Sequence, residues 1–174
     1  MQTTETQDKG SVKRPLVVGI LLTLSLVLVL TACSNSNTGN NDTGNEQTIK
    51  AGESLVIPTS EISETAQFYA VTVDDTRMEV VAVKAPDGTI RTAFNTCQVC
   101  NGSPKAYFVQ SGTTLQCQNC GNKFPMDKVE VEAGGCNPVP IFEEDKTVKD
   151  ESITVPYDTL KANVNRFPSN WKKS

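Results

Sequence analysis

The sequence contains no histidine, and this absence excludes several kinds of site. Catalysis by an imidazole base, copper or haem bound by histidine, and zinc sites that mix cysteine with histidine all need a residue that the chain lacks. Neither of the two CxxC motifs is followed by histidine, so covalent c-type haem attachment is excluded as well. The chemistry of this protein therefore depends on cysteine, carboxylate, hydroxyl or backbone groups.

Clustered positive charge is also missing. The chain has a formal net charge of −4. Residues 1–32 hold three basic and two acidic groups (+1), which leaves −5 for residues 33–174. An acidic chain with scattered charges is not built to bind nucleic acid, and its acidic residues are typical of a solvated surface.

The only long apolar run lies near the N-terminus. Residues 16–30 read LVVGILLTLSLVLVL and follow the basic residues Lys9, Lys13 and Arg14. The run ends at Leu-Thr-Ala-Cys33, which resembles the lipobox of bacterial lipoproteins. We predict that residues 1–32 are a lipoprotein signal peptide and that Cys33 is lipidated. The alternative is an uncleaved membrane helix, but such a helix needs roughly 20 apolar residues and this run is shorter.

The segment after Cys33 lacks side chains that could build a core. Residues 34–47 read SNSNTGNNDTGNEQ, a composition that stays disordered because it buries too little apolar surface. We therefore predict a lipid-anchored tether over residues 33–49 and a folded domain over residues 50–174. The lipid on Cys33 would attach this domain to the cell membrane at its extracytoplasmic face.

The folded part has a strand-like pattern. Its β-branched and aromatic runs predict strands, and Pro86-Asp87-Gly88 predicts a turn between two of them. One or two helical turns are expected near the C-terminus, at Asp158–Asn163. The fold class is thus a small β-rich (α+β) domain, with an antiparallel meander beside a zinc-ribbon-like hairpin and little helix. The expected strands are Ser54–Pro58, Gln67–Val73, Met78–Lys84, Thr89–Phe94 and Ile153–Val155.

The most informative pattern is a pair of CxxC motifs. They occupy residues 97–100 (CQVC) and 117–120 (CQNC), a spacing typical of tetrathiolate metal sites. Two intervening residues allow one tight turn to point both sulfurs at one ion. The residue after the second cysteine often needs a positive φ, which Asn101 (before Gly102) and Gly121 tolerate. A hairpin turning at Ser111-Gly112 would bring the two motifs together.

Three interpretations of these cysteines remain open from the residues alone. A metal centre could hold zinc, one iron or an iron–sulfur cluster, since four thiolates suit all three. Alternatively, the cysteines could form a pair of structural disulfides, because the cell envelope to which the protein would be exported favours thiol oxidation. A thiol–disulfide catalyst is the third possibility, although neither motif opens an evident helix. Cys136 adds a fifth thiol, which could be a ligand, a redox thiol or a buried structural residue.

Three stretches of the sequence resemble the FtrD-like membrane iron–sulfur domain family. They are DGTIRTAFNTCQVC, GTTLQCQNCGNKFPMD and GGCNPVPI, and the resemblance extends over about residues 50–168. It implies an iron–sulfur cluster or a single iron, with zinc as the alternative. It further implies an electron carrier or redox accessory that works with the iron permease of an uptake system. The alternative is a binding module held together by structural zinc or disulfides, without redox activity; in both cases we expect a carrier or binding protein more than a catalyst. The chain lacks the multiple membrane helices of some family members. The ligands implied are Cys97, Cys100, Cys117 and Cys120, with Cys136 as an additional candidate.

Overall fold

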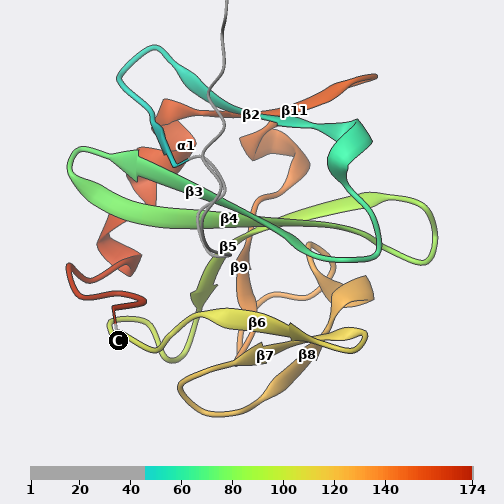
Figure 1. Ribbon diagram of the computed structural model, residues 1–174, viewed down its shortest axis with the longest axis vertical. Coiled ribbons are helices and arrows are strands. Elements are labelled where there is room, and N and C mark those ends of the chain that lie inside the picture. Colours follow the sequence, from blue (N-terminus) through green and yellow to red (C-terminus); the bar gives the residue numbers. More distant parts are fainter. Residues whose placement is uncertain (1–45, 174) are drawn as a thin grey trace, which may run out of the picture. The chain divides into compact units, whose positions relative to one another are not determined.

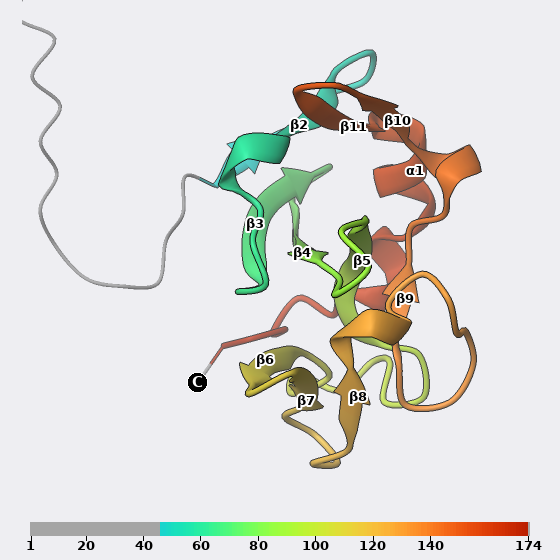
Figure 2. The ribbon, with the colours of Figure 1, turned by 90° about the vertical axis from the view of Figure 1, so that its right-hand side faces the viewer.

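The computed structural model describes residues 46–173, which form three β-sheets (Figure 1). One sheet has five strands and the other two have three each. In Figures 1 and 2 the five-stranded sheet lies between the other two. The order in the central sheet is β1-β3-β4-β5-β9, and the outer sheets have the orders β10-β11-β2 and β6-β7-β8. The only α-helix in this part of the chain is the short α1 (Tyr157–Ala162). The predicted β-rich fold class is confirmed.

The central sheet forms because its strands carry β-branched and aromatic side chains that fit a pleated surface. Its pairs are antiparallel, except that β1 runs parallel to β3. The turn between β3 and β4 contains Asp74 and Asp75 with φ of 45° and 63°, the conformation of a type I′ hairpin turn. The strands are β1 (Gln47–Thr48), β3 (Gln67–Val73), β4 (Thr76–Lys84), β5 (Ile90–Cys97) and β9 (Pro138–Pro140).

One outer sheet packs with α1 on the central sheet and closes the main core. Alternate residues of β2 and β11 point inward, and Leu55, Ile57 and Ile153 are fully buried. Leu160 of α1 and Phe167 join the same core. The strands are β2 (Ser54–Pro58), β10 (Thr147–Lys149) and β11 (Ser152–Pro156), with 3-10 turns at η1 (Thr59–Glu61), η3 (Glu143–Asp145) and η4 (Val164–Arg166).

The other outer sheet builds a second, smaller core. Its strands are β6 (Phe108–Ser111), β7 (Thr114–Cys117) and β8 (Lys123–Pro125), followed by η2 (Met126–Lys128). The side chains of Phe108, Leu115 and Phe124 are buried there against Val81 and Ala93 of the central sheet. This core also contains Cys97 and Cys117, so the candidate site is part of the packing.

The structure agrees with most of the predicted elements and adds several. The β4–β5 hairpin is present, as is the β6–β7 hairpin. Four strands were not predicted, namely β1, β8, β9 and β10. Strand β1 lies inside the range predicted as tether, so regular structure begins before residue 50. The predicted signal peptide and Cys33 lie outside the described residues. No helix within residues 46–173 is long and apolar enough to cross a membrane.

Candidate metal centre

Three separate chain segments bring five cysteines to one place. Cys97 is the last residue of β5, and Cys100 follows in the turn after it. Cys117 is the last residue of β7, and Cys120 follows in the same way. Cys136 lies in the loop before β9, two residues before Pro138, which pairs with Cys97. Strand pairing therefore brings the third segment to the end of β5.

The sulfur atoms lie close together but are not bonded. The Sγ atoms of Cys97, Cys100, Cys117 and Cys136 all lie within 4.8 Å of one another. Cys120 stands outside this group of four, yet its Sγ is 2.9 Å from that of Cys136. The Sγ of Cys136 is also 3.2 Å from that of Cys97. Within residues 46–173 all five cysteines are free thiols.

Backbone amides surround the sulfurs in both CxxC turns. The amide of Cys100 donates to the Cys97 sulfur at 3.4 Å. In the second turn the amides of Asn119 and Cys120 donate to the Cys117 sulfur. Such donors stabilise thiolates. The predicted positive φ is present at Gly121 (75°), whereas in the first turn it falls on Gly102 (90°) instead of Asn101.

Burial of the thiols is graded across the site. Cys97 and Cys117 are buried, Cys100 and Cys136 are half-buried, and Cys120 is exposed. Burial raises the pKa of Cys117 to about 12, and it also raises the pKa of Cys100 and Cys136. A hydrogen bond shared with Cys136 lowers the pKa of Cys120 to about 7. Most of the group therefore holds its protons unless a cation replaces them.

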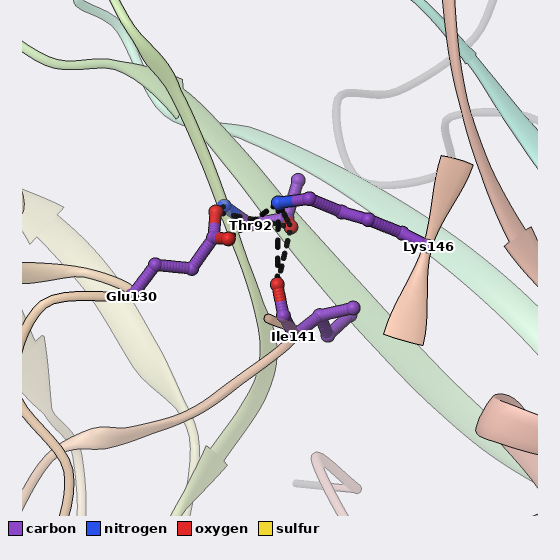
Figure 3. A network of polar contacts seen from close by, with 4 residues as sticks. All are labelled: Thr92, Glu130, Ile141 and Lys146. Carbon is purple, nitrogen blue, oxygen red and sulfur yellow. Dashed lines mark hydrogen bonds and ion pairs between the residues drawn. The ribbon is translucent and has the colours of Figure 1, made fainter. Parts of the chain in front are cut away.

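A buried ion pair fixes the loop that carries Cys136. Lys146 Nζ lies 2.5 Å from Glu130 Oε1, and the two side chains are 2 % and 8 % exposed. The other carboxylate oxygen of Glu130 accepts a hydrogen bond from the Thr92 amide of β5 at 2.6 Å. Lys146 also donates to the Thr92 hydroxyl and to the Ile141 carbonyl (Figure 3). The network ties the segment before Cys136 to β5.

A second buried network fixes the sheet that carries Cys117 and Cys120. The Asn95 side chain of β5 accepts a hydrogen bond from the Phe108 amide at 2.8 Å and donates to the Phe108 carbonyl at 3.2 Å. Its amide nitrogen also donates to Glu79 at 2.6 Å, and Glu79 in turn pairs with Lys172 at 3.0 Å. Strand β5 thus positions all three cysteine segments.

The donor set fits a metal held by thiolates. A tetrahedral ion with metal–sulfur bonds of about 2.3 Å needs sulfurs about 3.8 Å apart, which the group of four already approaches. A cluster with inorganic sulfide would need these sulfurs to move apart, since several irons and sulfides would lie between them. The spacing therefore favours one ion, either iron or zinc.

The sequence predicted the cysteines of the site but not the residues that hold them in place. Thr92, Asn95, Glu130 and Lys146 position the cysteines, and no motif marks them. One weak signal existed for Asn95, because a polar residue interrupts the buried run of β5 just before Cys97.

The fold and the site together define a small β domain with a thiolate metal centre. The family model described as "Membrane iron-sulfur containing protein FtrD-like" matches residues 62–167, a range that includes all five cysteines of the site. The chain belongs to this family, which is described as membrane-associated and iron–sulfur containing. No curated protein matches the sequence.

Proposed function

We propose that this protein is a membrane-attached electron carrier of an iron-uptake system, with iron bound by cysteine thiolates. The observation that carries this proposal is the convergence of sulfurs from three segments, four of them within 4.8 Å of one another. The family description supplies the metal, because it names iron–sulfur binding. Iron between thiolates exchanges single electrons, whereas zinc has no redox chemistry.

The arrangement of the residues suits electron transfer. Cys97 and Cys117 lie in a packed core and accept backbone hydrogen bonds, so they need little rearrangement when the charge of the centre changes. Exposed Cys120 opens one edge of the site to a partner. The two side chains between the cysteines of each CxxC turn carry no charge, which allows a partner to approach closely.

Attachment to the membrane and the choice of partner complete the proposal. A lipid on Cys33 would hold the domain at the extracytoplasmic face of the cell membrane, within reach of an iron permease. Residues between Cys33 and the domain would serve as a flexible tether. The family's description as a membrane protein supports this attachment.

The full chain, purified without oxygen, provides the test. We expect about one iron per chain, visible absorption from thiolate-to-iron charge transfer, and a reversible one-electron couple. Cys97→Ser should lose the colour. Cys33→Ser is the matched control. This variant should no longer be found in the membrane fraction, but its absorption spectrum should be that of the wild type. A colourless protein that contains zinc and shows no redox couple would contradict the proposal.

A structural zinc site is the second candidate function. It is favoured by the burial of Cys97 and Cys117 within the second core, because an ion there would hold a small sheet together. Four thiolates at this spacing suit zinc as well as iron. Metal content and absorption of the same preparation separate the two candidates.

A further inference from the structure

Five sulfurs surround a site for which a tetrahedral ion needs four. The geometry points to Cys136 as the fourth ligand of a single ion, beside Cys97, Cys100 and Cys117. We propose that Cys120 is a reserve thiol that removes Cys136 from the ion by forming a disulfide with it. This inference rests on the metal site of the proposed function and adds its regulation by oxidation.

The distances separate the ligands from the reserve thiol. The four proposed ligand sulfurs form one compact group, and the Cys120 sulfur does not belong to it. Within the group of four, the Cys136 sulfur lies on the side of Cys120, because it is close to the sulfurs of both Cys97 and Cys120. Its 2.9 Å contact with the Cys120 sulfur makes it the ligand best placed to pass from the ion to the reserve thiol.

The Cys120–Cys136 pair is also the pair best placed to react. Its sulfurs are 2.9 Å apart, and a disulfide bond of about 2 Å needs only a small further approach. Cys120 is exposed and open to an external oxidant, whereas Cys97 and Cys117 are buried. Gly134 and Gly135 precede Cys136 with φ of 84° and 80°, and both are exposed. The loop thus has room for the shift.

The reaction balances with a low-molecular-weight disulfide as the oxidant. The Cys120 thiolate attacks this disulfide, forms a mixed disulfide and releases one thiol. The Cys136 sulfur leaves the ion, attacks the Cys120 sulfur and releases the second thiol. Two electrons pass from the protein sulfurs to the oxidant. The two released sulfurs take up two protons from the solvent, and one of these balances the proton that Cys120 lost when its thiolate formed.

The consequence is a coupling between oxidation and metal release. After the reaction only Cys97, Cys100 and Cys117 remain as ligands. A site with three thiolates holds its ion more weakly than one with four, so the ion leaves. Reduction by a dithiol restores both thiols and the four-sulfur set.

The test uses zinc as the probe, because zinc does not change oxidation state and only the thiols then react. The full chain is loaded with zinc and treated with oxidised glutathione. A chromogenic chelator follows the released zinc, and mass spectrometry maps the disulfide. We expect release together with a Cys120–Cys136 link. Cys120→Ser should still bind one zinc per chain and should release it roughly tenfold more slowly, since the attacking thiol is gone. Gln118→Ser, an exposed change in the same turn, should behave like the wild type.

Several results would overturn the inference. One is loss of zinc binding by Cys120→Ser with full binding by Cys136→Ser, which would make Cys120 the fourth ligand. Others are a link within either CxxC motif, or equal release rates for Cys120→Ser and the wild type. Zinc binding without a redox couple of the iron-loaded protein would overturn the proposed function only. A failure to bind either metal would overturn both.

Discussion

At the scale of single residues, the site depends on polar groups that are buried and fully partnered. Thr92 is completely buried, yet its amide donates to Glu130 and its hydroxyl is bonded to Lys146. Glu130 has a φ of 62°, a conformation that a non-glycine residue keeps only where its surroundings enforce it. The ion pair with Lys146 holds Glu130 in this conformation.

Removal of one charge from this pair should be costly. Lys146→Met leaves the Glu130 carboxylate buried without its cation, and we expect the free energy of unfolding to fall by about 3 kcal/mol or more. Lys146→Met combined with Glu130→Gln removes both charges, while the new amide oxygen can still accept from Thr92. The double variant should therefore be more stable than the sum of the single effects implies. Urea unfolding, monitored by the fluorescence of Trp171, gives the free energy of unfolding of Lys146→Met, Glu130→Gln and the double variant.

An exposed pair provides the control for this cycle. Lys128 and Glu132 are 3.6 Å apart with side chains 43 % and 55 % exposed. Lys128→Met should change the unfolding free energy by less than about 0.5 kcal/mol. Strict additivity of the Lys146 and Glu130 effects would contradict the assignment of a coupled buried pair.

A second residue-scale prediction concerns pH. Hydrogen bonds from Lys161 and then from Tyr157 hold the pKa of Asp74 below its usual value of 3.8. A lowered pKa means that the folded state favours the ionised form, so this stabilisation is complete above pH 3.8 and is lost as the pH falls further. Asp74→Asn removes it at every pH. The stability difference between wild type and variant should thus be constant at higher pH and shrink below pH 3.8. A difference that grows there would contradict the contact.

At the scale of elements, β5 is the strand on which the site is assembled. It carries Thr92, which ties down the Cys136 loop, and Asn95, which holds β6 at Phe108. It then ends in Cys97, the first candidate ligand. Its neighbour β9 pairs with β5 and so brings the preceding Cys136 to the end of that strand. The strand is buried from Thr92 to Cys97, so none of these contacts competes with water.

Replacement of Asn95 should loosen the β6–β7–β8 sheet. Asn95→Leu keeps a similar volume but leaves the Phe108 amide and carbonyl buried without partners, at a cost of about 3 kcal/mol of unfolding free energy. Because the candidate ligand Cys117 lies on this sheet, zinc affinity should also fall, by roughly tenfold. Asn165→Leu is the control, since Asn165 is exposed and should leave both quantities unchanged. Normal zinc affinity in Asn95→Leu would show that Asn95 does not position the site.

The strands that the sequence predicted share one property. Runs such as Gln67–Val73 combine β-branched and aromatic residues over enough length to be recognised. Strand β9 reads PVP, and proline argues against a strand; it is tolerated here because β9 lies at the edge of its sheet. Strands β8 and β10 have only three residues each. Such short strands exist because their neighbours pair with them, and local sequence carries no sign of that.

The candidate site, like the strands, could be predicted only where it depends on local sequence. Spacing predicted a shared site for Cys97, Cys100, Cys117 and Cys120, because a CxxC turn is a local structure. The position of Cys136 depends on the pairing of β5 with β9, which joins residues about forty positions apart. The sequence therefore could not show that the compact group of four sulfurs contains Cys136 and leaves out Cys120. Glu130 and Lys146 resemble ordinary surface charges until the fold buries them.

At the scale of the whole described domain, two cores of different strength hold the molecule together. The main core joins the central sheet to the β10–β11–β2 sheet and contains most of the large side chains, including Trp171. The second core, beneath the β6–β7–β8 sheet, has few large side chains and includes two of the candidate ligands. A bound ion would therefore matter far more to one end of the domain than to the other.

Removal of the metal should expose this difference. We expect a chelator to raise the hydrogen exchange of amides in Phe108–Ser111 and Thr114–Cys117 strongly, because the ion links these strands to β5 and binding energy is also folding energy. Amides of β2 and β11 should keep their protection, since the main core contains no ligand. Hydrogen exchange followed by mass spectrometry, with and without zinc under reducing conditions, measures both regions in one sample. Equal loss of protection in all three sheets would mean that the domain unfolds as one unit, and no change would mean that the second core does not need the ion.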